Sequence, residues 1–588
     1  MQSAPYVNGM SLKLSNIYSS RKSRSIHRGF AALVMLLALG CDVAVPPTPY
    51  EEEMQQERRL RSMIEVADAA VPLSREEEAR TVTVPIRSDP RHLNPALNID
   101  TWGYRIAMHN IFESLVRRDP KTGKIIPGLA SRWTISPDAR TYTFTLRENV
   151  RWHDGRPFTA QDVRYSLTRV VDPKTPLGPF RDDLRPYYKR VDVPGPMEIR
   201  LVLGTANSFL LDHLAEYPIV PHHVFSKGMY PGSRGSQNPV GTGPFRFDSR
   251  KRGAEIVLTS NRSYWGPVPE IERLRFRLVE DWGKALTDLK RGELDILPEM
   301  IRQHYPDQIT PRVKRDFNEV KFATPGFSYI IWNTRHPMLR DFRVRRAFTM
   351  LTDRKRLVKE VHNGLARTIA GPYWRPSGLG DPKLEPWPYD PIEARNLLDK
   401  AGWRDRTGDK LRDKDGEPMR IVLMQPIGAD VLTDELKILS AEFAKSGVEL
   451  VSVPTDWPMM QRRLQAGRFM AAALQWAGRP AEDFSPLFHS TGRMNFGVIA
   501  NLMLDRLIIQ LRVTRNRNER GPRSAQIERI LHSYQPATFL HGPVHVALVH
   551  KRLSNVILGP DWFDFASMKV DVVVPDKEIS QPDGFPVE

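Results

Sequence analysis

Thr141-Tyr-Thr-Phe-Thr-Leu146 places an apolar side chain at every second position, which is the pattern of a half-buried β-strand. A helical pattern follows from Ala160 to Val171, where apolar residues recur three and four positions apart. Thr159 stands at the expected N-cap of that helix, and Asp162 follows three residues later. A strand followed so closely by a capped helix predicts a mixed α/β fold.

The same two kinds of segment alternate irregularly over the rest of the chain. Thr81-Val-Thr-Val-Pro-Ile86 predicts the first strand of the folded body. Pro391 to Ala401 predicts a helix, with Asp390 before its first turn and Gly402 at its end. Gly241-Thr-Gly243 lacks the third glycine and the following helix of a dinucleotide loop, so we interpret it as a tight turn in which glycine accepts positive φ.

The composition is that of an ordinary globular protein. The chain has 588 residues, 40% of them hydrophobic and 26% charged, and it carries a formal net charge of +17. These values exclude a disordered tail, a coiled-coil rod and a small disulfide-stapled domain. The basic residues are scattered and not interleaved with aromatic ones, so we expect no nucleic-acid partner.

The first 40 residues have the composition of a signal peptide. They carry five basic residues and no acid, so the remaining chain keeps a formal charge of +12. Phe30 to Gly40 is apolar but too short to span a bilayer. The only cysteine follows at Cys41, after Ala38-Leu-Gly40, which resembles the end of bacterial lipoprotein signals. The resemblance implies that Cys41 is lipidated; the alternative is a plain secretory signal with a free cysteine.

We interpret residues 41–80 as a stalk. The segment contains Pro46-Pro47 and then a charge-dense run that includes Glu51-Glu-Glu53 and Arg58-Arg59, a pattern that favours a solvated helix. No later stretch approaches the roughly 20 apolar residues of a membrane helix. We therefore expect a soluble, extracytoplasmic body that is tethered to a membrane by its lipid.

A series of short blocks resembles the family 5 extracellular solute-binding proteins, the oligopeptide and dipeptide receptors of ATP-binding-cassette importers. The likeness covers about residues 83–570, and it rests on the order of many blocks rather than on any one of them. The blocks include Leu93-Asn-Pro95, Phe112-Glu-Ser-Leu-Val116, Trp152-His-Asp-Gly155, Pro239-Val-Gly-Thr-Gly-Pro-Phe245, Asn261-Arg-Ser-Tyr-Trp-Gly266, Gly292-Glu-Leu-Asp-Ile296 and Leu397-Leu-Asp-Lys-Ala-Gly402.

The resemblance implies a two-lobed periplasmic-binding-protein fold with an extra domain, its lobes joined by two crossing strands. The first lobe would comprise residues 81–110, 216–326 and 497–588, the extra domain 111–215 and the second lobe 327–496. We expect the crossings near Thr324-Pro325 and between Met494 and Gly497.

The resemblance also implies the function. A receptor of this family is not an enzyme, has no catalytic residue, metal or cofactor, and delivers a peptide or peptide-like ligand to the importer's permease subunits and their ATPases. We expect a monomer. Two alternatives remain: a ligand sensor of the same fold that does not transport, and an extracytoplasmic hydrolase, for which the sequence offers no nucleophile motif.

Family spacing places part of the ligand site between Trp457 and Trp476, two tryptophans that match positions lining the cleft. Three residues beyond Trp476, the peptide receptors have an aspartate that pairs with the ligand's amino group, whereas this chain has Arg479. A guanidinium repels an ammonium group. Either the loop is shifted so that Asp483 takes the role, or the ligand presents an anionic or neutral end; Arg479 as a surface residue of a longer loop is the third possibility.

Three further residues complete the predicted site. Trp102 and Tyr104 lie in the loop after the first strand, which should face the cleft, and Asn333 ends the segment Tyr329-Ile-Ile-Trp-Asn333. His541 and His545 have the spacing of a metal pair, but Gly542 stands where a zinc-protease motif needs Glu and the neighbours suggest a strand. We therefore predict no metal site there.

Overall fold

The computed structural model describes residues 75–175, 184–514, 516–559 and 562–571. Cys41, the predicted signal peptide (1–40) and most of the stalk (41–80) lie outside the described residues. Helix α3 (Arg75–Ala79) leads directly into strand β1 (Thr81–Ile86), and Arg552 donates to the carbonyl oxygen of Ala79, so the folded body begins before the predicted strand. Among the described residues, no helix combines the length and apolar character that a bilayer crossing requires.

The elements predicted from local patterns are confirmed. Strand β5 spans Thr141–Leu146, and helix α5 spans Ala160–Thr168 and continues as the short 3₁₀ turn η1 (Arg169–Val171). Thr159 and Asp162 form a capping box at its start. The predicted helix at 391 is α15 (Pro391–Lys400), and its following glycine, Gly402, has a φ of 90°.

The first lobe and the extra domain each have a four-stranded sheet. The first-lobe sheet has the order β1-β10-β9-β8, in which only β1 and β10 are parallel. The extra-domain sheet is antiparallel in the order β4-β5-β7-β6. The bounds of these and the accompanying elements are α4 (Thr101–Ala107), β2 (Val116–Arg118), β3 (Ile125–Pro127), β4 (Ala130–Ile135), β6 (Tyr188–Gly195), β7 (Glu198–Leu203), α7 (Leu210–Glu216), α8 (His222–Phe225), α9 (Arg234–Gln237), β8 (Phe245–Lys251), β9 (Glu255–Ser260), β10 (Arg273–Leu278) and α10 (Trp282–Lys290).

A third, mixed sheet of eight strands runs through the second lobe and continues into the first. Its path is β11-β20-β13-β19-β17-β18, and β12 and β14 also pair with β20. Its strands and the elements around them are β11 (Ile296–Leu297), η2 (Arg302–His304), α11 (Pro311–Asp316), β12 (Phe317–Ala323), β13 (Gly326–Trp332), α12 (Pro337–Arg340), α13 (Phe342–Met350), α14 (Arg354–Glu360), β14 (Ala366–Arg367), η3 (Arg375–Ser377), β15 (Asp413–Lys414), β16 (Glu417–Pro418), β17 (Arg420–Pro426), α16 (Asp430–Ala444), β18 (Glu449–Thr455), α17 (Trp457–Gln465), β19 (Ala471–Ala477), α18 (Ser485–Phe488), α19 (Leu502–Val513), α20 (Arg517–Tyr534), β20 (Ala537–His550), β21 (Leu553–Ser554), η4 (Phe565–Ser567) and β22 (Lys569–Val570).

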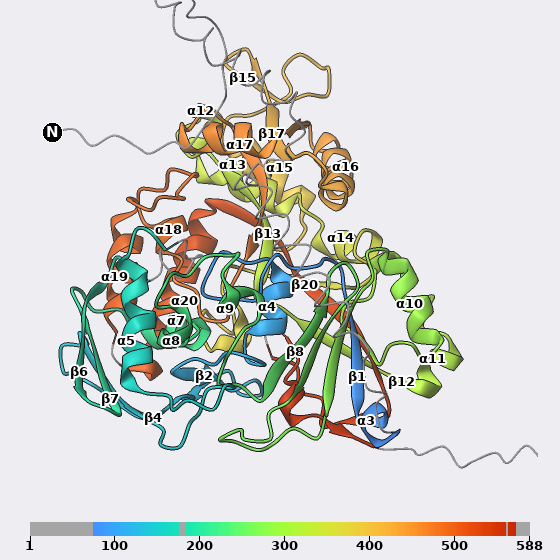
Figure 1. Cartoon of the computed structure of the whole chain (residues 1–588). Helices are drawn as coiled ribbons and strands as arrows, with labels where there is room; N and C mark the ends of the chain where they lie inside the picture. Colours follow the sequence, from blue (N-terminus) through green and yellow to red (C-terminus); the bar gives the residue numbers. More distant parts are fainter. Residues whose placement is uncertain (1–74, 176–183, 515, 560–561, 572–588) are drawn as a thin grey trace, which may run out of the picture. The chain divides into compact units, whose positions relative to one another are not determined.

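Strand β20 connects the two lobes (Figure 1). Its first residues, from Ala537 to His541, pair with β13, and its later residues, from Val544 to His550, pair with β12. Thr324-Pro325 separates β12 from β13, which is where we expected one crossing. The fold therefore has two lobes joined by two crossing segments, as predicted.

The second crossing does not lie between Met494 and Gly497, and that prediction was wrong. This loop joins α18 to α19, and both helices contribute to the hydrophobic cluster that contains Phe327 of β13 and Leu474 of β19. Because α20 joins the same cluster through Ile527 and Leu531, we place residues 497–536 with the second lobe and not with the first. The remaining division into domains stays a prediction.

Three sequence blocks meet around Glu113. Its buried carboxylate accepts hydrogen bonds from the hydroxyls of Thr242 (2.9 Å) and Tyr264 (2.8 Å) and from Nε1 of Trp265 (2.9 Å). Burial raises the pKa of Glu113, and the three donors oppose that rise. The hydrogen bonds between polar residues of these blocks therefore hold the first lobe against the extra domain.

Gly241 and Gly243 are required for close approach. Our expectation of positive φ was wrong, since neither residue has one. A Cβ at Gly241 would lie 1.7 Å from the carbonyl oxygen of Ile111, and one at Gly243 would lie 2.3 Å from that of Asn110. Only glycine lets these two backbone segments pass each other at this distance.

Gly241→Ala should therefore destabilise the protein by about 3 kcal/mol, because the added methyl group meets rigid backbone. Gly195→Ala is the matched control: its Cβ would meet nothing within 4 Å and its φ is not positive, so we expect a change below about 0.5 kcal/mol. Urea unfolding followed by circular dichroism measures both. Equal midpoints for the two variants would contradict this account of Gly241.

Candidate functional site

The extra domain contacts the second lobe through residues 207–216. The Ser208 N–H donates to the carbonyl oxygen of Arg512 (2.6 Å), and its hydroxyl donates to that of Leu511 (2.8 Å). Phe209 is fully buried in the same hydrophobic cluster as α19 and α20. These contacts bring one end of α7 against the end of α19 and define the sides of the candidate site.

A buried ionic group reinforces this contact. Asp212 of α7 accepts from Arg118 (2.9 Å) with one carboxylate oxygen and from Arg520 of α20 (2.9 Å) with the other. The side chains of Asp212 and Arg520 are only 1% and 3% exposed. The Arg520 guanidinium also lies 4.3 Å from the ring centroid of Phe209. A charge removed from water to this extent depends on its partners.

Arg479 forms an ion pair across the two lobes. Its Nε lies 3.3 Å from a carboxylate oxygen of Glu216, the last residue of α7, and its backbone N–H donates to the carboxylate of Glu482 (3.0 Å). The hydroxyl of Tyr104 donates to the backbone carbonyl of Glu216 (3.4 Å). The structure thus brings Tyr104 and Arg479 to the same residue of α7.

Asp483 lies in the same loop as Arg479 and pairs with a different cation. One of its carboxylate oxygens accepts from the Ser485 N–H (2.9 Å), and the other lies 3.2 Å from Nε of Arg512. Both charged residues that we proposed as partners for a ligand terminus are therefore paired with protein groups in this conformation.

A cavity of about 390 Å³ opens beside these pairs, within the size range of small-ligand sites. One side is formed by Tyr187 and His213 of the extra domain, and the other by Asp483, His489 and Arg512. Its lining carries both signs of charge, which suits a ligand with both an ammonium and a carboxylate group.

Trp476 lies next to this loop, near the end of β19. It is half-buried, and its ring centroid is 6.4 Å from that of Phe484. Within the described part of the chain, its Nε1 is buried and has no hydrogen-bond partner. Trp476, Arg479 and Asp483 thus come from one strand end and its following loop.

The other three candidate residues lie elsewhere. Trp102 is 8% exposed and packs in the first-lobe core, with ring centroids 5.6 Å from Trp282 and 5.7 Å from Trp562. Asn333 donates to the carbonyl oxygens of Gly467 and Phe469. Trp457 is 49% exposed at the start of α17. A role for these three residues in ligand binding stays a prediction.

Sequence reasoning missed three residues that pair across the lobes, namely Asp212, Glu216 and Arg520. About 300 positions separate α7 from α20, and no motif links them. The one available signal was a set of arginines between 512 and 523, which we counted among the scattered basic residues.

Comparison with known proteins identifies one matching family model and several similar proteins. Residues 124–495 match the family model for bacterial extracellular solute-binding proteins, family 5. Di/tripeptide-binding protein 2 of Pseudomonas aeruginosa is 25% identical over 550 residues, covering 88% of this chain and all of the relative. Heme-binding protein A of Haemophilus influenzae is 25% identical over 514 residues, covering 82% and 91%. The oligopeptide-binding protein AppA of Bacillus subtilis, solved with a nonapeptide, is 22% identical with a TM-score of 0.65, covering 83% and 98%.

Asp212→Asn should destabilise the protein by about 3 kcal/mol or more, because it leaves the buried Arg520 cation without its counter-charge. Asp192→Asn removes the partner of Arg190 in an exposed pair and should cost less than about 1 kcal/mol. Chemical denaturation of both variants tests this. An Asp212→Asn variant as stable as the control would show that the pair across the lobes is energetically unimportant.

Proposed function

The chain belongs to the family 5 bacterial extracellular solute-binding proteins, and from this premise we propose that it binds a peptide or peptide-like solute between its lobes and delivers it to the membrane subunits of an ATP-binding-cassette importer. It is a binding protein and not an enzyme. The observation that carries the proposal is the charged cavity beside the Arg479 and Asp483 loop. Relatives named as di/tripeptide- and dipeptide-binding proteins support the ligand class.

The ion pairs of the site suggest how a ligand terminus is accommodated. A ligand carboxylate would replace Glu216 beside Arg479, or a ligand ammonium would replace Arg512 beside Asp483. In both exchanges a protein partner is released and a ligand group of the same sign takes its position. Arg479 or Asp483 therefore stays paired while the cleft closes, which limits its cost of desolvation, whereas the released Glu216 or Arg512 must be solvated or find another partner.

We also propose that the protein is extracytoplasmic, monomeric and anchored to the membrane by a lipid on Cys41. The alternative within the same fold is a sensor that binds its ligand without transport. Genes for permease and ATPase subunits adjacent to its own would favour transport over sensing.

A peptide titration tests the function. Di-, tri- and nonapeptide pools at concentrations about 100 times their Kd should stabilise the protein by about 2.7 kcal/mol. They should also change the intrinsic fluorescence if Trp476 lies near the ligand. If no pool produces a thermal shift or a change in fluorescence, peptide recognition is contradicted.

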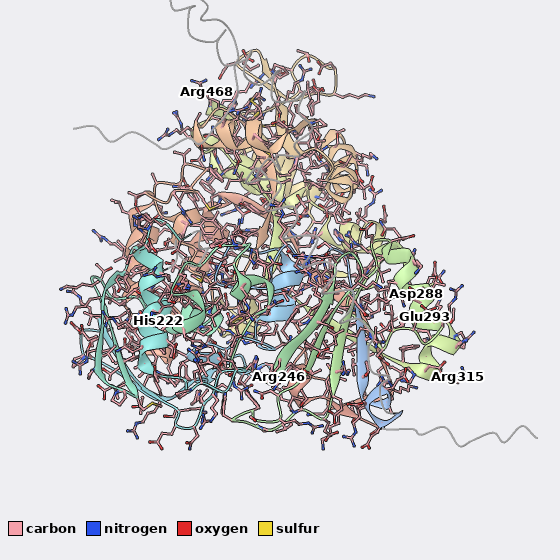
Figure 2. The ribbon with its side chains drawn as sticks, in the orientation of Figure 1. His222, Arg246, Asp288, Glu293, Arg315 and Arg468 are labelled. Carbon is pink, nitrogen blue, oxygen red and sulfur yellow. The ribbon has the colours of Figure 1, made fainter. Side chains whose placement is uncertain are left out.

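The same titration with Arg479→Asp distinguishes the two modes of binding. If Arg479 faces the ligand, the acidic replacement should strengthen binding of peptides with a free amino group about tenfold, and N-acetylated peptides should not gain. Arg468→Asp makes the same change of net charge at an exposed position after α17 (Figure 2) and serves as control. Identical affinities for wild type and both variants would place Arg479 outside the ligand site.

A further inference from the structure

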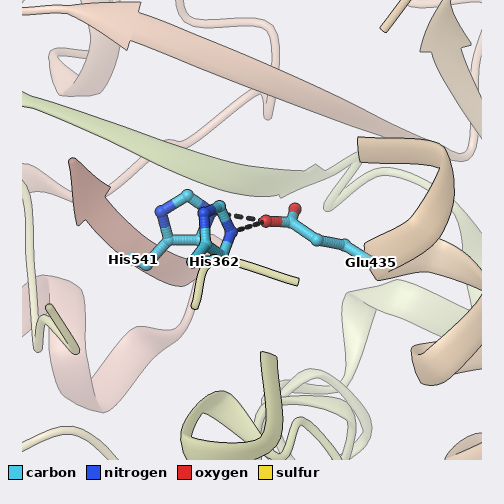
Figure 3. A group of neighbouring side chains, drawn as sticks. All are labelled: His362, Glu435 and His541. Carbon is cyan, nitrogen blue, oxygen red and sulfur yellow. Dashed lines mark hydrogen bonds and ion pairs between the residues drawn. The ribbon is translucent and has the colours of Figure 1, made fainter. Parts of the chain in front are cut away.

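Three ionisable side chains from distant parts of the chain converge beside strand β20 (Figure 3). His362 follows α14, Glu435 lies in α16 and His541 lies in β20. All three are at least 95% buried. Candidate ligand atoms of the three residues lie within 4.8 Å of one another. The Nε2 atoms of both histidines contact the same carboxylate oxygen of Glu435, His541 at a distance of 2.6 Å.

We propose that His362, Glu435 and His541 form a binding site for a divalent transition-metal ion. Two imidazole nitrogens and one carboxylate oxygen are a donor set that suits Zn²⁺, with a fourth position left for water. Neither the proposed solute cavity nor the family comparison assigns a role to these residues.

The spacing of the donors requires a small adjustment. Metal–nitrogen and metal–oxygen bonds of about 2.0–2.1 Å place tetrahedral donors roughly 3.3 Å apart. The donors now share hydrogen bonds, so they would separate by less than about 1 Å when an ion takes the place of the bridging protons. Side-chain rotation can supply this movement.

His541 can release its bridging proton to its own second nitrogen. Its Nδ1 is buried and has no hydrogen-bond partner in the part of the chain that the structure describes. When an ion binds Nε2 of a neutral imidazole, the proton resides on Nδ1. Because metal-ligating histidines normally donate their second ring N–H, metal binding also requires a small rearrangement that supplies an acceptor for Nδ1–H of His541.

Arg302 opposes metal binding at His362. Its Nη1 lies 2.9 Å from Nδ1 of His362. Because a guanidinium only donates, Nδ1 of His362 must accept, and the imidazole proton stays on Nε2, toward Glu435. The metal-bound form needs that proton on Nδ1, so Arg302 must withdraw. Arg302 is half-buried, and it belongs to η2, outside the second lobe. The ion and Arg302 therefore compete for one histidine.

Metal titration of the full chain, purified without an affinity tag and stripped with a chelator, tests the proposal. Zn²⁺ added in competition with a chromophoric chelator should give one tightly bound ion per chain. Glu435→Gln and His541→Ala should weaken binding at least about 100-fold. His545→Ala is the matched control, because His545 lies on the same strand but contacts Thr324, and it should bind as wild type does.

Arg302→Gln provides a gain-of-binding test that does not depend on removing a ligand. It should tighten Zn²⁺ binding about tenfold, because the competing donor is removed. Co²⁺ in place of Zn²⁺ should give the visible absorption of a four-coordinate site in wild type and lose it in Glu435→Gln.

Several results would overturn the proposal. They are the absence of a stoichiometric ion in wild type, or unchanged affinity in Glu435→Gln and His541→Ala. If those two variants do not fold, the comparison of wild type with Arg302→Gln decides, and equal affinities overturn the proposal. In that case the three residues are a hydrogen-bonded support for β20 and nothing more.

Discussion

The backbone pairing of β20 is the constraint on which the rest of the structure depends. A single strand of 14 residues pairs with β13 at its start and with β12 toward its end, so one continuous ladder belongs to both lobes. Thr324-Pro325 interrupts the facing strand opposite the middle of β20, and proline removes a backbone donor there. The lobes are thereby held together by regular hydrogen bonds and separated at one short interruption, which is the arrangement that a hinge between two lobes requires.

Side chains reinforce this connection in two places. In the first place, Phe209 packs into the hydrophobic cluster of the second lobe. The carboxylates of Asp212 and Glu216 then pair with Arg520 and Arg479, respectively. Near the middle of β20, His541 joins His362 and Glu435, and Arg302 contacts that group from outside the second lobe. The solute cavity and the proposed metal site thus both adjoin contacts between lobes. Binding at either one can therefore affect how the lobes are held.

Local elements were predictable from the sequence, while contacts between distant segments were not. Strand β5, the capped helix α5 and the helix α15 follow from periodicity and capping residues that lie within a few positions of one another. The fold class and the likeness of Trp476 to a cleft residue came from family resemblance. The pairing of Arg479 with Glu216, the place of α19 and α20, and the meeting of His541 with His362 and Glu435 depend on tertiary packing. Local sequence carries no signal for such contacts, which is also why the positive φ expected at Gly241 was wrong.

Native mass spectrometry of the freshly purified full chain tests the central claim, a solute site between the lobes, most directly. A receptor that closes over its ligand can retain it through purification, because release requires the lobes to open. We predict masses that exceed the mass of the modified polypeptide by the masses of bound peptides. These additional masses should disappear after unfolding and refolding, and they should return when peptides are added. A protein that carries no ligand when isolated, and that acquires none when incubated with peptide pools, would contradict the account.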